Sequence, residues 1–243
     1  MQEMIPKPLN ISGTYNTRDL GGYNTSDGRI TRKNRILRSD GLQSLSTSDK
    51  EALYSYGVRV IIDMRSKGEV FMGKCSMKKF KDVKYYHVPL LDHIHSESDG
   101  SDFPDSLHEM YIDLYENSKE AVCEVLRIIS ENPDDCVLYN CMAGKDRTGI
   151  ISALMLMLAS VPREAVIADY AATEEYLEEF ISKRKKLLST LKIDIPDYLF
   201  KSPAVEMEMA IDWLSASYGD VFCYVKELGL PEESIERLKN KLL

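Results

Sequence analysis

The residues whose types and spacing could do chemistry lie at positions 140–149, which read Asn-Cys-Met-Ala-Gly-Lys-Asp-Arg-Thr-Gly. Five residues separate Cys141 from Arg147. The apolar run at 136–139 predicts a buried strand before this segment, and the apolar run at 150–159 predicts a buried helix after it. Cys141 is therefore expected in a tight loop between a strand and a helix N-terminus, where unpaired backbone N–H groups make an anion site.

The chemistry that this spacing favours is attack by a thiolate on a phosphate monoester. The helix N-terminus and the neighbouring cations favour the charged form of Cys141, and the curl of the loop brings Arg147 back to face the sulfur. The planar fork of Arg147 then binds two phosphate oxygens. The Thr148 hydroxyl is expected to hydrogen-bond the sulfur and so to help the cysteine leave a phosphocysteine. The predicted phosphate-binding residues are Met142, Ala143, Gly144, Lys145, Asp146 and Arg147.

A purely structural interpretation makes Cys141 a small buried hydrophobe and Arg147 a surface cation. A bare Cys-x5-Arg pattern occurs by chance in many chains. Here the signal is specific, because a strand and a helix flank the loop and two glycines suit its shape. Gly144 supplies the backbone freedom for the curl, and Gly149 is expected to let the helix start close to the sheet.

These residues resemble the signature of the cysteine-dependent phosphatases. The Gly-Lys-Asp-Arg-Thr-Gly run at 144–149 is similar to that of the tyrosine/serine phosphatases of the bacterial LipA and mycobacterial PtpB type. The likeness extends over nearly the whole chain. Further matching blocks lie at 16–23, 36–39, 62–66 with Glu69, 218–219, 228–230 and 235–238.

The resemblance implies an α/β fold of the protein tyrosine phosphatase kind, with a mostly parallel central sheet flanked by helices and a strand–P-loop–helix site. It implies a phosphatase that needs no metal or cofactor and acts on phosphotyrosine. Phosphoserine, phosphothreonine and phosphoinositide substrates are also implied by it. No histidine or cysteine cluster has the spacing of metal ligands, in agreement with that expectation.

One position departs from the family pattern, because Asn140 stands where the family has a histidine before the cysteine. Asparagine can hydrogen-bond the backbone but cannot carry charge. Two alternatives to a full phosphatase follow. The first is a catalytically weak domain that binds phosphate esters without turnover. The second is a rhodanese-like sulfurtransferase, which the Arg-Thr-Gly run at 147–149 and the flanking blocks disfavour.

The leaving oxygen needs a proton, so a carboxylic acid is expected beside the phosphate site. Asp92 follows a predicted strand that ends at Pro89, at the edge where α/β sheets bind ligands. In the resembled family an aspartate just after this proline is the general acid. Asp146 competes for the role, but a carboxylate next to Arg147 is expected to stay ionised and to orient the arginine.

Other charged residues have expected supporting or binding roles. Arg18 and Asp19 are expected to brace the loop, with Asn140 as a further support. Arg65 either lines the substrate mouth or pairs with Glu69. Lys145 either adds positive charge at the mouth or is a solvated lysine. The basic run at 183–186 is expected to be a solvated helix face, with an anionic lipid surface as the alternative.

Composition excludes several classes of protein. The 243 residues are 44% apolar, which is ample for one large α/β domain spanning 1–243. The net charge of −8 argues against nucleic acid as a partner. The apolar stretch at 149–161 is too short for stable membrane insertion, and no secretion signal is seen, so a cytoplasmic location is expected unless export uses a signal-less route. Five irregularly spaced cysteines suit reduced thiols.

Strands alternating with helices predict the α/β class. Residues 1–35 are expected to form an arm, and 92–108 a polar loop that is a possible lid. Strands are expected at 36–38, 58–63 and 83–88 besides 136–139. Helices are expected from the capping signal at 46–48 to Tyr56, within 109–130, after Pro162, at 204–217 and after Pro231.

Overall fold

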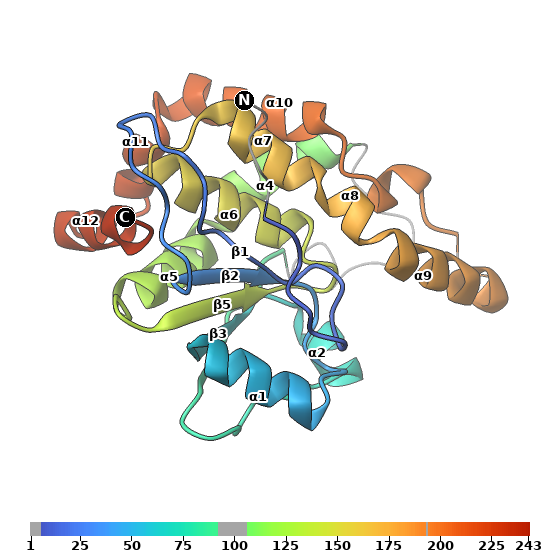
Figure 1. The fold of residues 1–243 in the computed structure, drawn as a ribbon. Helices are drawn as coiled ribbons and strands as arrows, with labels where there is room; N and C mark the ends of the chain where they lie inside the picture. The colour runs from blue at the N-terminus through green and yellow to red at the C-terminus, as the bar shows by residue number, and fades with distance from the viewer. Residues whose placement is uncertain (1–5, 92–105, 193) are drawn as a thin grey trace.

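The structure is a computed structural model that describes residues 6–91, 106–192 and 194–243. Its centre is a five-stranded sheet with the order β1-β2-β5-β3-β4 (Figure 1). The strands are β1 (Arg18–Asp19), β2 (Ile36–Ser39), β3 (Val58–Asp63), β4 (Lys84–His87) and β5 (Cys136–Asn140). Within this sheet β1 pairs antiparallel with β2, and the other pairs are parallel.

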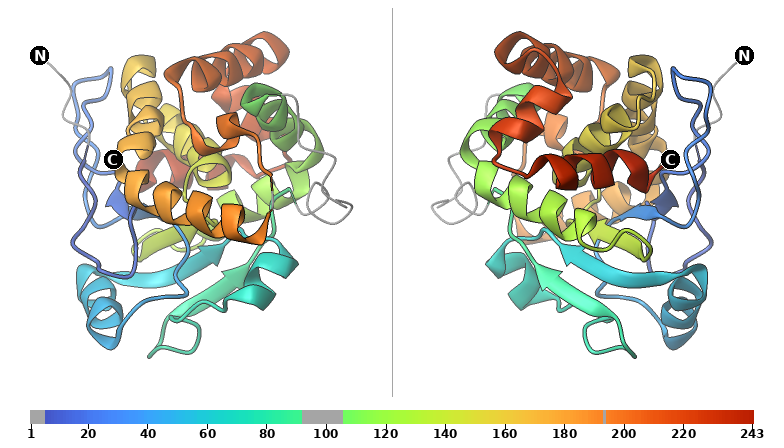
Figure 2. Two further views of the ribbon diagram at one scale, coloured as in Figure 1. Left: turned by 90° about the vertical axis from the view of Figure 1, so that its right-hand side faces the viewer. Right: turned by 90° about the vertical axis from the view of Figure 1, so that its left-hand side faces the viewer.

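The inner strands are buried on both faces, as their nearly continuous apolar sequences predict. Alternate side chains enter two separate cores. Ile36, Val60 and Tyr139 belong to the larger core, whereas Leu37 and Leu138 belong to the smaller one. Figure 2 shows the corresponding layers, with the helix at 47–56 below the sheet and most of the helices above it.

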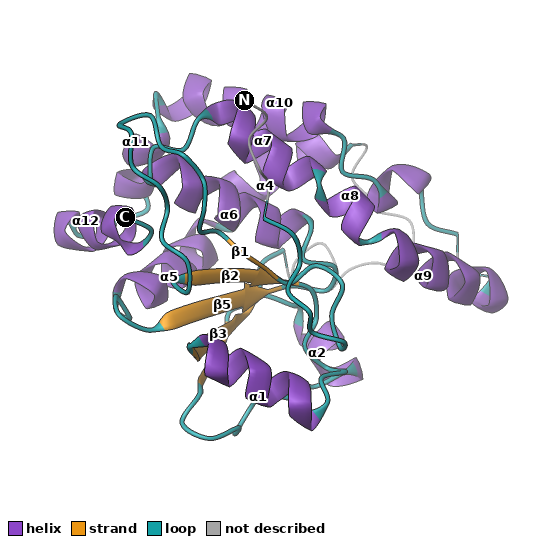
Figure 3. Ribbon diagram, in the orientation of Figure 1, coloured by secondary structure: helices purple, strands orange, loops and turns teal. Residues whose placement is uncertain are grey.

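The smaller layer holds α1 (Thr47–Tyr56) and α2 (Lys67–Met72), and each begins with a capping box. The larger layer is helical throughout (Figure 3). Its helices are α4 (Leu107–Asn117), α5 (Lys119–Ser130), α6 (Asp146–Leu158), α7 (Arg163–Ala171), α8 (Thr173–Tyr176), α9 (Glu178–Leu191), the 3-10 helix η1 (Asp197–Phe200), α10 (Ala204–Tyr218), α11 (Val221–Glu227) and α12 (Glu232–Lys241).

These elements confirm the predicted fold class, and several boundaries differ from expectation: β4 is shorter than the strand expected at 83–88, and α6 begins at Asp146, ahead of the apolar run at 150–159. Leu107 and His108 belong to the first turn of α4 and not to the preceding loop, because Ser106 caps the helix there. The rest of the expected loop, at 92–105, lies outside the described residues. The expected arm contains β1, which adds a short strand to the sheet edge.

None of the helices within residues 6–91, 106–192 and 194–243 has the length and apolarity needed to cross a membrane.

Candidate active site

The loop at 141–147 begins where β5 ends, at the carboxyl edge of the sheet. The parallel register places Asn140 beside Ser39 of β2 and Asp63 of β3. Backbone hydrogen bonds join the end of β5 and the loop to the residues that follow the two neighbouring strands. After β2, Gly41 N–H donates to Met142 O at 3.0 Å, and after β3, Met64 N–H donates to Asn140 O at 2.8 Å. Cys141 is buried at this edge, directly before the loop turns into α6.

Gly144 allows the loop to turn tightly against β2. Its φ of 65° lies in the left-handed region, and a Cβ atom there would lie 2.5 Å from the carbonyl oxygen of Ser39. Both facts require glycine, as the sequence predicts. The Gly144 carbonyl accepts hydrogen bonds from Asn16 Nδ2 at 2.9 Å and from Arg38 Nη2 at 2.7 Å. The loop is therefore held from the N-terminal arm and from β2.

Asp169 of α7 holds the two arginines behind this support. Its carboxylate pairs with Arg18 Nε at 3.0 Å and with Arg38 Nη1, and all three side chains are buried. Burial alone would raise the pKa of Asp169, but the two guanidinium groups lower it to about 2. Arg18 also donates to Asn16 Oδ1, so it supports the loop through Asn16.

Asp19 has a different position from the one expected. Its carboxylate accepts hydrogen bonds from Gly21 N–H, Asn34 N–H and the Tyr56 hydroxyl. These contacts hold the arm against the far end of the sheet, not the 141–147 loop. Asn16 takes the supporting position instead, and sequence reasoning missed it although it opens the motif block at 16–23.

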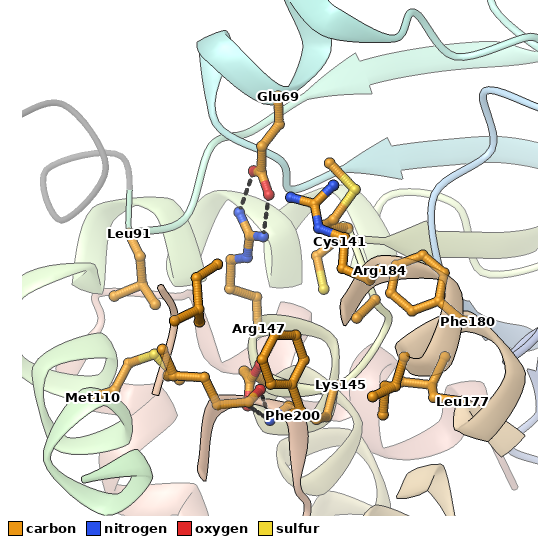
Figure 4. A pocket seen from close by; sticks show the side chains of 16 residues that line it. Glu69, Leu91, Met110, Cys141, Lys145, Arg147, Leu177, Phe180, Arg184 and Phe200 are labelled. Carbon is orange, nitrogen blue, oxygen red and sulfur yellow. Dashed lines mark hydrogen bonds and ion pairs between the residues drawn. The ribbon is translucent and has the colours of Figure 1, made fainter. Parts of the chain in front are cut away.

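Arg147 lies on the first turn of α6 and pairs with Glu69 of α2 through both carboxylate oxygens. Nη1 donates to Oε2 at 2.7 Å and Nη2 donates to Oε1 at 2.8 Å (Figure 4). Burial opposes the charge of Arg147, but the hydrogen bonds with Glu69 raise the pKa of the guanidinium above its usual value. Nη1 also donates to Met64 O at 3.4 Å.

These contacts use one edge of the Arg147 guanidinium and leave another open. The Nη1–Nη2 edge is taken by Glu69, whereas Nε and the second hydrogen of Nη2 have no partner among the described residues. A guanidinium presents two adjacent N–H groups along such an edge, in the spacing that suits two oxygens of a phosphate. Arg147 is thus oriented by a carboxylate while keeping two parallel donors.

Arg65 is not in a position to bind substrate. Its side chain is completely buried, and Nε and Nη2 donate to the two carboxylate oxygens of Asp63 at 2.9 and 2.7 Å. The remaining nitrogen donates to Gly73 O at 2.7 Å. Arg65 does not pair with Glu69 either, since Glu69 faces Arg147. The prediction of Arg65 as a phosphate-binding residue is therefore corrected: its donors hold α2 against the sheet.

Lys145 is neither solvated nor free at the mouth. Its side chain is 3% exposed, and Nζ donates to Leu199 O at 2.9 Å and to Lys201 O at 2.6 Å. It also lies 3.2 Å from Asp146 Oδ1. The lysine thereby attaches the segment around η1 to the 141–147 loop.

Asp146 contacts Tyr111 and Lys145, and no hydrogen bond or ion pair joins it to Arg147. The Tyr111 hydroxyl donates to Asp146 Oδ1 at 2.8 Å and lies 2.5 Å from the Tyr170 hydroxyl.

Gly149 was expected to let the helix start close to the sheet, but its close neighbour is a helix. A Cβ on Gly149 would lie 3.2 Å from the Tyr170 ring, so this glycine allows close packing against α7 and not against the sheet.

Two buried polar atoms on the residues that flank the 141–147 loop in sequence lack partners in the described part of the chain. They are Thr148 Oγ1 and Asn140 Oδ1. Asn140 Nδ2 makes two long contacts, with Asp63 Oδ1 at 3.4 Å and Cys141 O at 3.3 Å. Buried polar atoms without partners are rare in native proteins and mark places where a ligand or reacting group completes the bonding.

A cavity of about 210 Å³ contains Cys141 and Arg147 (Figure 4). The 141–147 loop forms its floor. Its walls come from α4, α9 and the segment around η1, and they are mostly apolar. The apolar wall residues are Leu91, Met110, Leu177, Phe180, Ile181, Ile195, Leu199 and Phe200. Asp92, the predicted general acid, lies outside the described residues, directly after Leu91 of this wall.

A cysteine at a strand end, a tight loop and an arginine on the following helix are the arrangement that the sequence resemblance implies for cysteine-dependent phosphatases. The model of the tyrosine phosphatase family matches residues 9–243. The chain therefore belongs to the tyrosine phosphatase family, and it is a phosphatase, as the sequence predicts.

Individual proteins of known name are similar to this chain. The tyrosine-protein phosphatase of Nostoc commune is 29% identical over 216 residues, which cover 85% of this chain and 74% of that protein. The triple specificity protein phosphatase PtpB of Mycobacterium tuberculosis is 22% identical, with 96% of this chain and 98% of that protein covered. The crystal structure of TpbA from P. aeruginosa covers 95% of this chain and 100% of that chain at 11% identity, with a TM-score of 0.46.

Proposed function

We propose that this enzyme hydrolyses phosphotyrosine in proteins through a phosphocysteine on Cys141. The open Nε–Nη2 edge of Arg147, in the cavity that contains Cys141, is the observation that carries the proposal. This edge supplies two parallel hydrogen-bond donors for the phosphate in the cavity that holds the nucleophile, Cys141. The N–H groups of the 141–147 loop and the N-terminus of α6 supply further donors for the remaining oxygens.

In the first step the Cys141 thiolate attacks phosphorus, and the bond from phosphorus to the tyrosine oxygen breaks. Arg147 and the loop N–H groups stabilise the charge on the non-bridging oxygens. The tyrosine oxygen leaves with the electron pair and takes a proton from a general acid. In the second step water attacks phosphorus and gives a proton back to the deprotonated general acid, the phosphorus–sulfur bond breaks, and Cys141 is regenerated as the thiolate.

We assign the general acid to Asp92. The competing residue, Asp146, already has two partners, since its Oδ1 accepts a hydrogen bond from the Tyr111 hydroxyl at 2.8 Å and lies 3.2 Å from the Lys145 ammonium. Asp92 follows the cavity wall at Leu91 directly in the chain. Thr148 is assigned to the second step, since its unpartnered hydroxyl can donate to the departing thiolate.

The apolar walls support an aryl substrate. Phe180 and Phe200 line the cavity with several aliphatic side chains, and such walls bury an aromatic ring more favourably than a polyhydroxylated one. Phosphoserine and phosphothreonine peptides and phosphoinositides remain secondary substrates of the proposal, in view of a relative named as a triple specificity phosphatase.

The test is phosphate release from a phosphotyrosine peptide in the presence of EDTA. Wild type should turn over, Cys141→Ser should not, and Cys223→Ser, which changes an exposed thiol, should match wild type. Asp92→Asn should slow hydrolysis of a phosphoserine peptide, whose alkoxide leaving group needs the proton most. Tight binding of phosphopeptide without turnover by folded wild type would instead establish the binding-only alternative, with Asn140→His as its rescue variant.

A further inference from the structure

A second cavity lies beside the one that contains Cys141. Its volume is about 370 Å³, and it shares Met142, Phe180 and Arg184 with the first. Beyond these shared residues its walls are mostly polar, with Leu187 as the large apolar exception; the polar members are Ser12, Tyr15, Asp40, Gln43, Ser44 and Lys183. A ligand seated on Cys141 can therefore continue past Arg184 into a space lined by hydrogen-bonding groups.

Arg184 is the cation at the junction of the two cavities. Its side chain is exposed and reaches from α9 toward the part of the first cavity where Cys141 lies (Figure 4). It makes no hydrogen bond or ion pair with any residue that the structure describes. Its neighbours on α9 differ: Lys183 Nζ lies 2.6 Å from Glu179 Oε1, and Lys185 Nζ lies 2.7 Å from Asp197 Oδ1.

The acidic groups of the two cavities already have other partners. The Asp40 carboxylate accepts hydrogen bonds from the backbone N–H groups of Tyr15 and Asn16 at about 3.0 Å. Glu69 is paired with Arg147 in both oxygens. Asp146, the remaining carboxylate of the first cavity, lies 3.2 Å from the Lys145 ammonium. None of these carboxylates pairs with Arg184, so an anion at the junction gains a charge-assisted contact.

We propose that the polypeptide flanking the phosphotyrosine runs from the first cavity into the second, and that Arg184 binds the carboxylate of an aspartate or glutamate beside the phosphotyrosine. This inference rests on the proposed function and names its substrate more closely. The apolar walls around Cys141 and the hydrogen-bonding groups of the second cavity suit an aryl ring attached to a peptide backbone. A polyphosphorylated inositol ring would meet apolar walls around Cys141, where Lys145 is bound to backbone carbonyls, and Lys183 of the second cavity is already paired with Glu179.

The experiment compares three phosphotyrosine peptides that differ only in the residues on both sides of the phosphotyrosine, which are acidic, neutral or basic. Wild type should have a kcat/KM about fivefold higher for the acidic peptide than for the neutral one, as one partly exposed charge pair allows. Arg184→Glu should reverse the order and favour the basic peptide. The wild-type preference should shrink as salt rises from low to molar concentration.

Lys186→Glu is the matched control. It makes the same change of charge on the same exposed helix, but Lys186 lines neither cavity. It should keep the wild-type order of the three peptides. Equal shifts in Arg184→Glu and Lys186→Glu would show a general charge effect and overturn the assignment to Arg184.

The outcomes separate this inference from the proposed function. Absence of turnover on every phosphotyrosine peptide overturns the proposed function itself. Turnover of all three peptides at equal kcat/KM overturns the inference alone. Loss of activity toward a soluble phosphoinositide in Arg184→Glu, with an unchanged order of peptides, also overturns it and assigns Arg184 to that other class of substrate.

Discussion

The Arg147 guanidinium and the Glu69 carboxylate meet edge to edge, with hydrogen bonds of 2.7 and 2.8 Å. The pair joins α6, the helix that follows the cysteine loop, to the short helix α2. Glu69 also accepts a hydrogen bond from Ser66 N–H at 2.6 Å, so one carboxylate caps α2 and orients the arginine. The position of the Arg147 donors therefore depends on a carboxylate that belongs to α2.

We predict that Glu69→Gln lowers kcat/KM toward a phosphotyrosine peptide about 10- to 100-fold, because misplacing a phosphate donor by an ångström has effects of that size. Ser66→Ala is the control. It removes the hydrogen bond from Glu69 N–H to Ser66 Oγ and so weakens the cap by about 1 kcal/mol, but it keeps the carboxylate. Equal losses of activity in the two variants would assign the effect to the stability of α2.

Thr148→Val should separate activity from stability. The buried hydroxyl has no partner among the described residues, so removing it should not lower the melting temperature. Loss of its hydrogen bond to the departing thiolate should slow kcat about tenfold and let phosphoenzyme accumulate. Thr148→Ser keeps the hydroxyl and should keep kcat. A destabilised Thr148→Val variant with normal kcat would contradict this role.

Lys145→Met tests whether this lysine positions the cavity wall or binds the substrate. If it positions the wall, KM for aryl phosphates should rise, and amide exchange at 195–201 should become faster, because two carbonyls lose their donor. The loss of stability should be about 1–3 kcal/mol. Lys185→Met, which removes an exposed ion pair with Asp197, is the control and should have little effect. A larger loss for phosphoinositides than for aryl phosphates would restore the direct-binding role.

Asp169→Asn should destabilise the protein by about 3–5 kcal/mol, because it leaves Arg18 and Arg38 buried without their shared counter-charge. Chemical unfolding measures this difference. Asp212→Asn removes an exposed carboxylate that pairs with Arg163 at 2.6 Å, and it should change the free energy of unfolding by less than about 1 kcal/mol. Similar values for the two variants would show that the buried cluster is not what supports the loop.

The local parts of the site could be predicted from the sequence. The strand, the loop, the helix and the need for glycine at 144 follow from neighbouring residues. The residues that pair with one another in the site could not be predicted from the sequence, because the two members of each pair are far apart in the chain. Arg147 and Glu69 are separated by 78 positions and Arg18 and Asp169 by 151. The sequence therefore offered Arg65 as a partner for Glu69, although the structure pairs Arg65 with Asp63.

The role of a charged residue was harder to predict from the sequence than the position of a motif, because its partner often lies far away in the chain. Lys145 belongs to the motif, yet its ammonium is bound by carbonyls of residues 199 and 201, which no local pattern reveals. Arg184 was one of four basic residues in a run, and only the fold distinguishes it by the cavity that it lines. Asn16 could have been found, since it opens the family-like block at 16–23, in which the arginine and the aspartate received attention instead.

Mass spectrometry after rapid denaturing quench tests the central claim most directly. Wild type would be mixed with a phosphotyrosine peptide, and the peptide containing residue 141 examined for a phosphoryl group. We predict a transient phosphoryl adduct on Cys141 that forms before free phosphate appears, and its absence in Cys141→Ser. Phosphate release at the wild-type rate by Cys141→Ser, or turnover without any adduct at residue 141, would contradict the account.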